Sequence, residues 1–129
     1  MLILPRIVVI EPEWPTRAYL RAELEELGYD VTAHEHPEDA AQYLERWGLR
    51  PHLILADLTH NGIRADAVRA LIARYPDARV VLVVGAFSTL PTWLRNHASR
   101  ILRRPCSVQE IVTVIRELAP LPSDLAAER

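Results

Sequence analysis

The chain has 129 residues, 50% of them hydrophobic, which fits one domain with a sizeable core. Its formal net charge of −2 argues against a protein that binds nucleic acid through a strongly basic surface. No hydrophobic run approaches the roughly eighteen residues needed to cross a bilayer, and the single cysteine cannot form an internal disulfide, so we expect a cytoplasmic protein with no membrane partner.

The first strand and helix are predicted from two short patterns. Residues 6–10 form a hydrophobic run of strand length. Pro15 suits the first turn of a helix, and Gly28 stands where a left-handed residue ends one. The expected buried stripe of this helix consists of Leu20, Leu24 and Leu27.

The second unit is predicted to be shorter. A strand covers about residues 30–33, and a helix follows Pro37 and ends at Gly48. Two acids in its first turn, Glu38 and Asp39, interact favourably with the positive end of the helix dipole. Residues at helical spacing on its apolar side are Ala40, Tyr43, Leu44 and Trp47.

The third unit contains the central strand. Residues 53–56 lack polar alternation, as expected of a strand covered on both faces, and the run ends at Asp57. A turn-rich stretch with Asn61 and Gly62 follows. The next helix is predicted from the apolar spacing of Val68, Leu71, Ile72 and Tyr75.

The last two strands are predicted at residues 80–84 and 100–103, with a less regular helix over about 90–97 between them. A final helix begins at Ser107, where Glu110 completes a capping box. Its apolar stripe consists of Val108, Ile111, Ile115 and Leu118.

Five strands alternating with five helices predict an α/β domain over residues 1–119, built on a doubly wound five-stranded parallel sheet. Residues 120–129 show no further periodicity, and we expect a disordered tail there. The ligand site of such a sheet lies beyond the carboxyl ends of its strands. The residues at these ends are Glu11, Pro12, Glu13, Asp57, Gly85, Arg104 and Pro105.

The order and spacing of these positions resemble the receiver domains of response regulators. The resemblance spans about residues 6–118 and is carried by the segment His52-Leu-Ile-Leu-Ala-Asp57-Leu58, the helix end Leu27-Gly28-Tyr29, and the step Arg104-Pro105. It implies the flavodoxin-like, CheY-like (βα)5 fold with strand order 2-1-3-4-5. It also implies a role in two-component signalling or a phosphorelay, with Asp57 at the position of the phosphoacceptor.

The metal-binding acids of that family are incomplete in this chain. Glu11 and Pro12 stand at the positions of the acidic pair, so one carboxylate is longer and the other is missing. Because magnesium needs a near-ideal set of oxygen ligands, Glu11 and Asp57 are weak candidate ligands, and we expect weak or absent magnesium and no other cofactor. Glu13 is either a substitute ligand or a solvated loop acid, and we favour the second.

The switch positions differ as well. Gly85 stands where the family has a hydroxyl, and Ile101 where it has a rotating aromatic ring. Arg104 replaces a lysine, although the chain contains no lysine at all, so this exchange carries less weight than Pro12 or Gly85. A guanidinium is always charged and can grip a carboxylate with two hydrogen bonds. We therefore predict a standing ion pair between Asp57 and Arg104.

Two functions remain open. The favoured one is a degenerate receiver that acts, without phosphorylation, as a protein-interaction module toward a partner or a second copy through the fourth helix, fifth strand and fifth helix. The alternative is a weakly functional receiver phosphorylated on Asp57 by a histidine kinase, with no enzymatic activity beyond its own modification. The interface candidates are Trp93, Leu94, Arg95 and Arg103. If Trp93 and Leu94 are buried, they are only core residues.

Other chemistries have less support. His34 and His36 lack a third ligand at metal spacing and are interpreted as surface residues. Cys106 is interpreted as part of a packed turn rather than a redox sensor. A flavin protein would share the architecture, but the acidic loop after the first strand, beginning at Glu11, would repel a phosphate.

Overall fold

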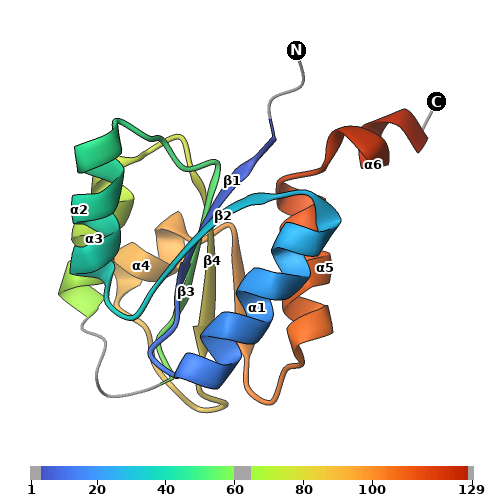
Figure 1. The fold of residues 1–129 in the computed structure, drawn as a ribbon. Coiled ribbons are helices and arrows are strands. Elements are labelled where there is room, and N and C mark those ends of the chain that lie inside the picture. The colour runs from blue at the N-terminus through green and yellow to red at the C-terminus, as the bar shows by residue number, and fades with distance from the viewer. Residues whose placement is uncertain (1–3, 60–64, 128–129) are drawn as a thin grey trace.

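The hydrophobic runs form one five-stranded parallel sheet in the computed structural model, which describes residues 4–59 and 65–127 (Figure 1). The strand order β2-β1-β3-β4-β5 is the predicted one. The turn expected around Asn61 and Gly62 lies outside the described residues. The strands are β1 Arg6–Ile10, β2 Asp30–His34, β3 Leu53–Asp57, β4 Arg79–Val84 and β5 Arg100–Arg103.

Helices cover both faces of the sheet, α1 and α5 on one face and α2, α3 and α4 on the other (Figure 1). Gly28 and Gly48 end α1 and α2 at φ 109° and 62°, left-handed values that glycine adopts without strain. Within the described residues, none of the helices has the length and hydrophobicity to cross a bilayer. The helices are α1 Trp14–Leu27, α2 Pro37–Trp47, α3 Ala65–Arg74, α4 Thr92–His97, α5 Val108–Leu118 and α6 Pro122–Ala127.

The core has two layers because successive strand residues point to opposite faces of the sheet. In β1, Ile7 and Val9 pack under α1 and α5, whereas Val8 and Ile10 pack under the other three helices. All four are fully buried. This packing fixes the carboxyl end of β1, and with it the position of the next residue, Glu11.

Part of the predicted stripe on α2 is not core. Ala40 and Leu44 are fully buried, but Tyr43 is 38% exposed and Trp47 is 60% exposed. The spacing of these four residues is helical, but an edge position beside β2 leaves only a narrow strip of the helix to bury. The aromatic side chains at its border therefore remain at the surface.

The prediction of a disordered tail is wrong for residues 121–127. Leu121 is 3% exposed and belongs to the core layer of α1 and α5, and the short helix α6 follows it. Asp124 accepts a hydrogen bond from the Leu121 amide (3.2 Å) and pairs with Arg116 of α5. A single apolar residue between two prolines has no periodicity, so the sequence pattern gave no sign of this docking.

We expect Leu121→Ala to lower the free energy of unfolding by about 2–4 kcal/mol, because it removes a buried side chain and leaves a cavity under α6. Urea denaturation followed by circular dichroism measures this. The matched control is Leu125→Ala on α6, where the side chain is 52% exposed and the expected change is within about 0.5 kcal/mol. Equal small changes in both variants would show that the segment adds nothing to the core.

Candidate functional site

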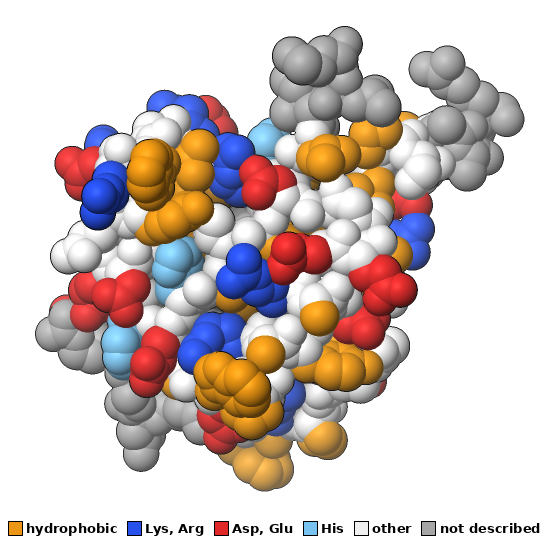
Figure 2. Space-filling view, in the orientation of Figure 1, with side chains coloured by type: hydrophobic (Ala, Val, Ile, Leu, Met, Phe, Trp, Pro, Cys, Tyr) orange, Lys and Arg blue, Asp and Glu red, His pale blue; other side chains and the backbone are white. Residues whose placement is uncertain are grey.

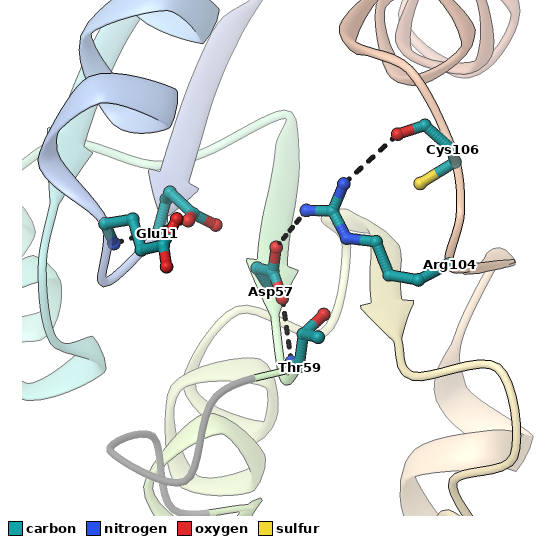
Figure 3. Close-up of polar contacts among 6 residues, drawn as sticks. Glu11, Asp57, Thr59, Arg104 and Cys106 are labelled. Carbon is teal, nitrogen blue, oxygen red and sulfur yellow. Dashed lines mark hydrogen bonds and ion pairs between the residues drawn. The ribbon is translucent and has the colours of Figure 1, made fainter.

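Three charged side chains meet at the carboxyl edge of the sheet. Glu11 directly follows β1, Asp57 is the last residue of β3, and Arg104 directly follows β5. Figure 3 shows Glu11 and Arg104 on either side of Asp57. Glu11 and Asp57 are 1% and 3% exposed, so both carboxyl groups are almost completely removed from water.

Both carboxylate oxygens of Asp57 accept hydrogen bonds. The Thr59 amide donates to Oδ1 at 2.7 Å, and Nη2 of Arg104 donates to Oδ2 at 2.5 Å (Figure 3). Nη1 of Arg104 donates to the Cys106 carbonyl oxygen at 3.1 Å, which holds the guanidinium in place. The predicted ion pair between Asp57 and Arg104 is therefore present.

The pKa of Asp57 reflects these contacts. Burial alone raises this pKa, but the interaction with the neighbouring Glu11 and the hydrogen bonds from Thr59 and Arg104 outweigh burial and hold it below its ordinary value. Asp57 is therefore a carboxylate at neutral pH, with its charge neutralised by Arg104.

Glu11 behaves in the opposite way. Burial is the main cause that raises its pKa to about 8, and the neighbouring negative charge of Asp57 adds to this because it disfavours a second ionised carboxyl group. Oε1 of Glu11 accepts the Glu13 amide at 3.3 Å. Oε2 is buried and has no hydrogen-bond partner within the described part of the chain, which makes ionisation costly. At neutral pH the site thus contains one proton on Glu11 and one negative charge on Asp57.

The loop after β1 does not fit a magnesium ion. Pro12 has no side-chain oxygen, and its carbonyl oxygen accepts a hydrogen bond from Nη1 of Arg17 at 3.3 Å. The same nitrogen donates to the carbonyl oxygen of Glu11 at 2.8 Å, and the side chain of Glu13 is exposed. Among the described residues, no cluster of three His, Cys, Asp or Glu side chains is placed to hold a metal. Pro12 supplies no carboxylate and Asp57 already binds Arg104, so the loop lacks the set of oxygen ligands that magnesium prefers.

Gly85 follows β4 and is packed against a hydroxyl. A Cβ added to Gly85 would lie 2.7 Å from Oγ of Ser88, so a side chain there would require this hydroxyl to rotate away. The Ser88 amide donates to the Gly85 carbonyl oxygen at 3.2 Å, and Nη1 of Arg103 donates to the carbonyl oxygens of Ser88 (2.9 Å) and Gly85 (3.4 Å). The turn over residues 85–88 is therefore tied to the end of β5.

The remaining switch positions lie on β5 and just after it. Ile101 is partly buried and packs against the core layer of α2, α3 and α4. Pro105 is exposed, and its peptide bond with Arg104 is cis. The loop then enters α5 through the predicted capping box, in which the Glu110 amide donates to Oγ of Ser107 at 3.1 Å.

The interface candidates do not share one environment. Leu94 is 1% exposed and is a core residue, so its interpretation as an interface anchor is wrong. Trp93 is partly buried; it stacks on His97 with ring centroids 3.9 Å apart, and Cζ of Arg69 lies 4.8 Å from the centre of its ring. Arg95 and Arg103 are exposed. The irregular apolar spacing of α4 did not tell which side of this short helix faces the core.

The three other candidates, His34, His36 and Cys106, have structural surroundings. The interpretation of His34 as a surface residue is wrong: it is partly buried, its ring centroid lies 5.4 Å from that of Tyr43, and burial lowers its pKa. His36 is near the surface at the start of α2. Burial also raises the pKa of the Cys106 thiol, although Arg104 acts against this shift. A thiol with a raised pKa is a poor nucleophile at neutral pH.

Three residues that shape the site were not predicted. Thr59 contributes a backbone amide, which carries no side-chain signature. Arg17 braces the loop after β1 through carbonyl oxygens, and Ser88 fills the space beside Gly85. Arg17 lies one turn into the first helix, so its spacing from Glu11 was the one available signal.

Replacing Glu11 tests whether its carboxyl group is protonated in the folded protein. Neutral Glu11 stabilises the fold fully below the ordinary glutamate pKa of about 4.3, and this stabilisation is lost as the pH rises toward about 8. Glu11→Gln cannot ionise. We expect its stability relative to the wild type to increase across this range, by at most about 1.4 kcal/mol per pH unit. Urea denaturation between these pH values measures this, and parallel profiles would contradict it.

Replacing Arg104 tests the ion pair. Arg104→Leu leaves the Asp57 charge buried without a partner, and we expect a loss of about 2–3 kcal/mol; the full cost of a buried pair is discounted because the Arg104 side chain is 30% exposed. Adding Asp57→Asn should recover part of this loss in a double-mutant cycle. The control, Arg100→Leu, breaks an exposed pair with Glu117 and should cost about 0–1 kcal/mol. Strict additivity of the Asp57 and Arg104 changes would contradict their coupling.

Comparison with known proteins gives structural matches only. Neither protein-family models nor curated protein sequences match the chain significantly. A signal receiver domain from Vibrio parahaemolyticus superposes with a TM-score of 0.72 at 22% identity, covering 91% of each chain. A CheY-like receiver domain from Methanospirillum hungatei gives 0.74 at 17% identity, covering 89% of this chain and 93% of that one. The receiver domain of NtrX from Brucella abortus gives 0.72 at 18% identity, covering 88% and 97%. The chain therefore has the fold of response-regulator receiver domains.

Proposed function

We propose that the chain is a degenerate receiver of the two-component type, a protein-interaction module that works without phosphorylation of Asp57. The ion pair between Asp57 and Arg104 is the observation that carries this proposal. It engages the carboxylate that would accept a phosphoryl group, and it is formed by the residue at the position of the family's phosphate-contacting lysine.

The chemistry of phosphoryl transfer supports this proposal. Attack on phosphorus requires a free carboxylate oxygen and a cation that offsets the negative charge of the incoming group. Here Oδ1 of Asp57 accepts the Thr59 amide and Oδ2 accepts Arg104. Glu11 is neutral near pH 7 because its pKa is raised to about 8. We propose that magnesium is not bound and that no other cofactor is required.

The same contacts support a single fixed arrangement of the output surface. Arg104 links the end of β3 to the loop before α5, and Arg103 links the end of β5 to the turn before α4. We propose that α4, β5 and α5 present one constant surface to a protein partner or a second copy, and bind neither nucleic acid nor membrane.

The second candidate function is a weak phosphoacceptor. Asp57 stays ionised because its pKa is lowered, and an ionised carboxylate is the nucleophile that phosphorylation needs. In this candidate a histidine kinase would be the donor, Arg104 would swing from Asp57 to the phosphoryl group, and the chain would catalyse only its own modification.

Mass spectrometry of the intact protein after incubation with acetyl phosphate and magnesium tests the proposal. We expect no phosphoryl adduct in the wild type, because Arg104 occupies Asp57 and the metal ligands are incomplete. Fluorescence of Trp14, which is 69% exposed beside the loop after β1, should show no saturable response to magnesium.

Two variants serve as controls for this experiment. Asp57→Asn identifies the modified residue if an adduct forms. The double variant Pro12→Asp, Arg104→Lys restores the second acid and the lysine, and we expect it to bind magnesium more tightly than the wild type. A single magnesium-dependent adduct in the wild type that disappears in Asp57→Asn would replace the proposal with the phosphoacceptor function.

A further inference from the structure

Charged residues are divided between the two edges of the sheet. Residues 78–109 contain five arginines and no acidic residue. Residues 14–47 contain eight acidic residues and three arginines, a net charge of −5. The first segment includes β5 and the second includes β2, which are the two edge strands of the sheet. We call residues 78–109 the basic pole and residues 14–47 the acidic pole.

Internal ion pairs remove only part of this asymmetry. In the basic pole, Arg104 pairs with Asp57 and Arg100 pairs with Glu117. Arg95 is exposed and has no ion pair within the described residues, and Arg103 donates only to neutral carbonyl oxygens. The positive charges of Arg95 and Arg103 are therefore available to an acidic surface.

The basic pole also presents a fully exposed aromatic ring. Phe87 is 98% exposed, which is unusual for a large hydrophobic side chain. It lies in the turn 85–88, which is closed by the Ser88 amide and tied down by Arg103. Because these contacts fix the backbone of the turn before binding, less conformational freedom is lost on association, so Phe87 is suited to act as an anchor.

The acidic pole has a hollow of complementary character on α2. Trp47 is 60% exposed and Tyr43 is 38% exposed, and they supply its aromatic surface. In Figure 2, hydrophobic side chains reach the surface at the upper left, near the end of α2, next to acidic and basic groups. The hollow is lined by Asp39, Gln42, Tyr43, Glu45, Arg46 and Trp47.

We propose that copies of this chain associate head to tail, with Phe87 and the arginines of one copy's basic pole on the α2 hollow of the next copy. Carboxylates of Asp39 and Glu45 face the positive charges, and Tyr43 and Trp47 receive the ring. Because the two poles lie at opposite edges of the sheet, one contact leaves a free pole at each end, and the assembly is open-ended. This inference rests on the proposed interaction function and names its partner as a second copy.

Sedimentation velocity of the full chain tests this inference. At low ionic strength we expect the average mass to rise continuously with protein concentration, without a limit at two copies. The association should weaken at least tenfold between about 0.01 M and about 1 M salt, since screening shortens the reach of charge interactions from about 30 Å to about 3 Å. Phe87→Ser should also weaken it at least tenfold, whereas Leu125→Ser, an exposed apolar residue on α6, should not change it.

One variant at each pole distinguishes head-to-tail contacts from a symmetric dimer. Arg95→Glu alters only the basic pole, and Trp47→Ser alters only the acidic pole without adding a charge that could pair with the carboxylate introduced at position 95. Each variant alone should stay monomeric at concentrations tenfold above those at which the wild type associates. An equimolar mixture should form a 1:1 dimer that does not grow, because the one pair of intact poles is used. Circular dichroism confirms that both variants are folded.

Three results would overturn the inference: a wild type that is monomeric at every concentration at low salt, single variants that associate as the wild type does, or a mixture that forms no dimer. None of these results bears on phosphorylation of Asp57, which the acetyl phosphate experiment decides separately. Failure of the self-association and failure of the phosphorylation-independent function are therefore distinguishable.

Discussion

The contact between Asp57 and Arg104 organises the carboxyl edge of this sheet. A buried carboxylate is tolerated in a protein interior only when hydrogen bonds and an opposite charge compensate for lost water. Arg104 supplies that charge from the far side of β4, so the end of the central strand and the loop before α5 are held together. The loop after β1 responds to the same interaction, because an ionised Asp57 next to a second buried acid favours a proton on Glu11.

This arrangement gives the site no net charge near neutral pH. One positive group, one negative group and one neutral acid occupy the place where a magnesium site would carry several carboxylates. Pro12 adds no carboxylate to this site, so the fixed guanidinium of Arg104 is enough to balance the one negative charge of Asp57.

The parts that were predictable from sequence are those with a local cause. The strands came from hydrophobic runs, and the ends of α1 and α2 came from Gly28 and Gly48, whose left-handed backbone is a property of single residues. The ion pair was predictable because the ends of β3 and β5 were placed and the charges were known. The proton on Glu11 was not, because it depends on burial by segments distant in sequence. The docking of Leu121 and the burial of Leu94 depend in the same way on tertiary packing.

The hydrogen bond from the Thr59 amide to Asp57 makes one backbone proton an internal reporter of the site. The Thr59 nitrogen lies 2.7 Å from a carboxylate oxygen of Asp57, so the amide proton is strongly deshielded. The extent of this deshielding depends on the charge of that oxygen. Nuclear magnetic resonance of this one amide would thus follow the ionisation of Asp57 without any label at the site.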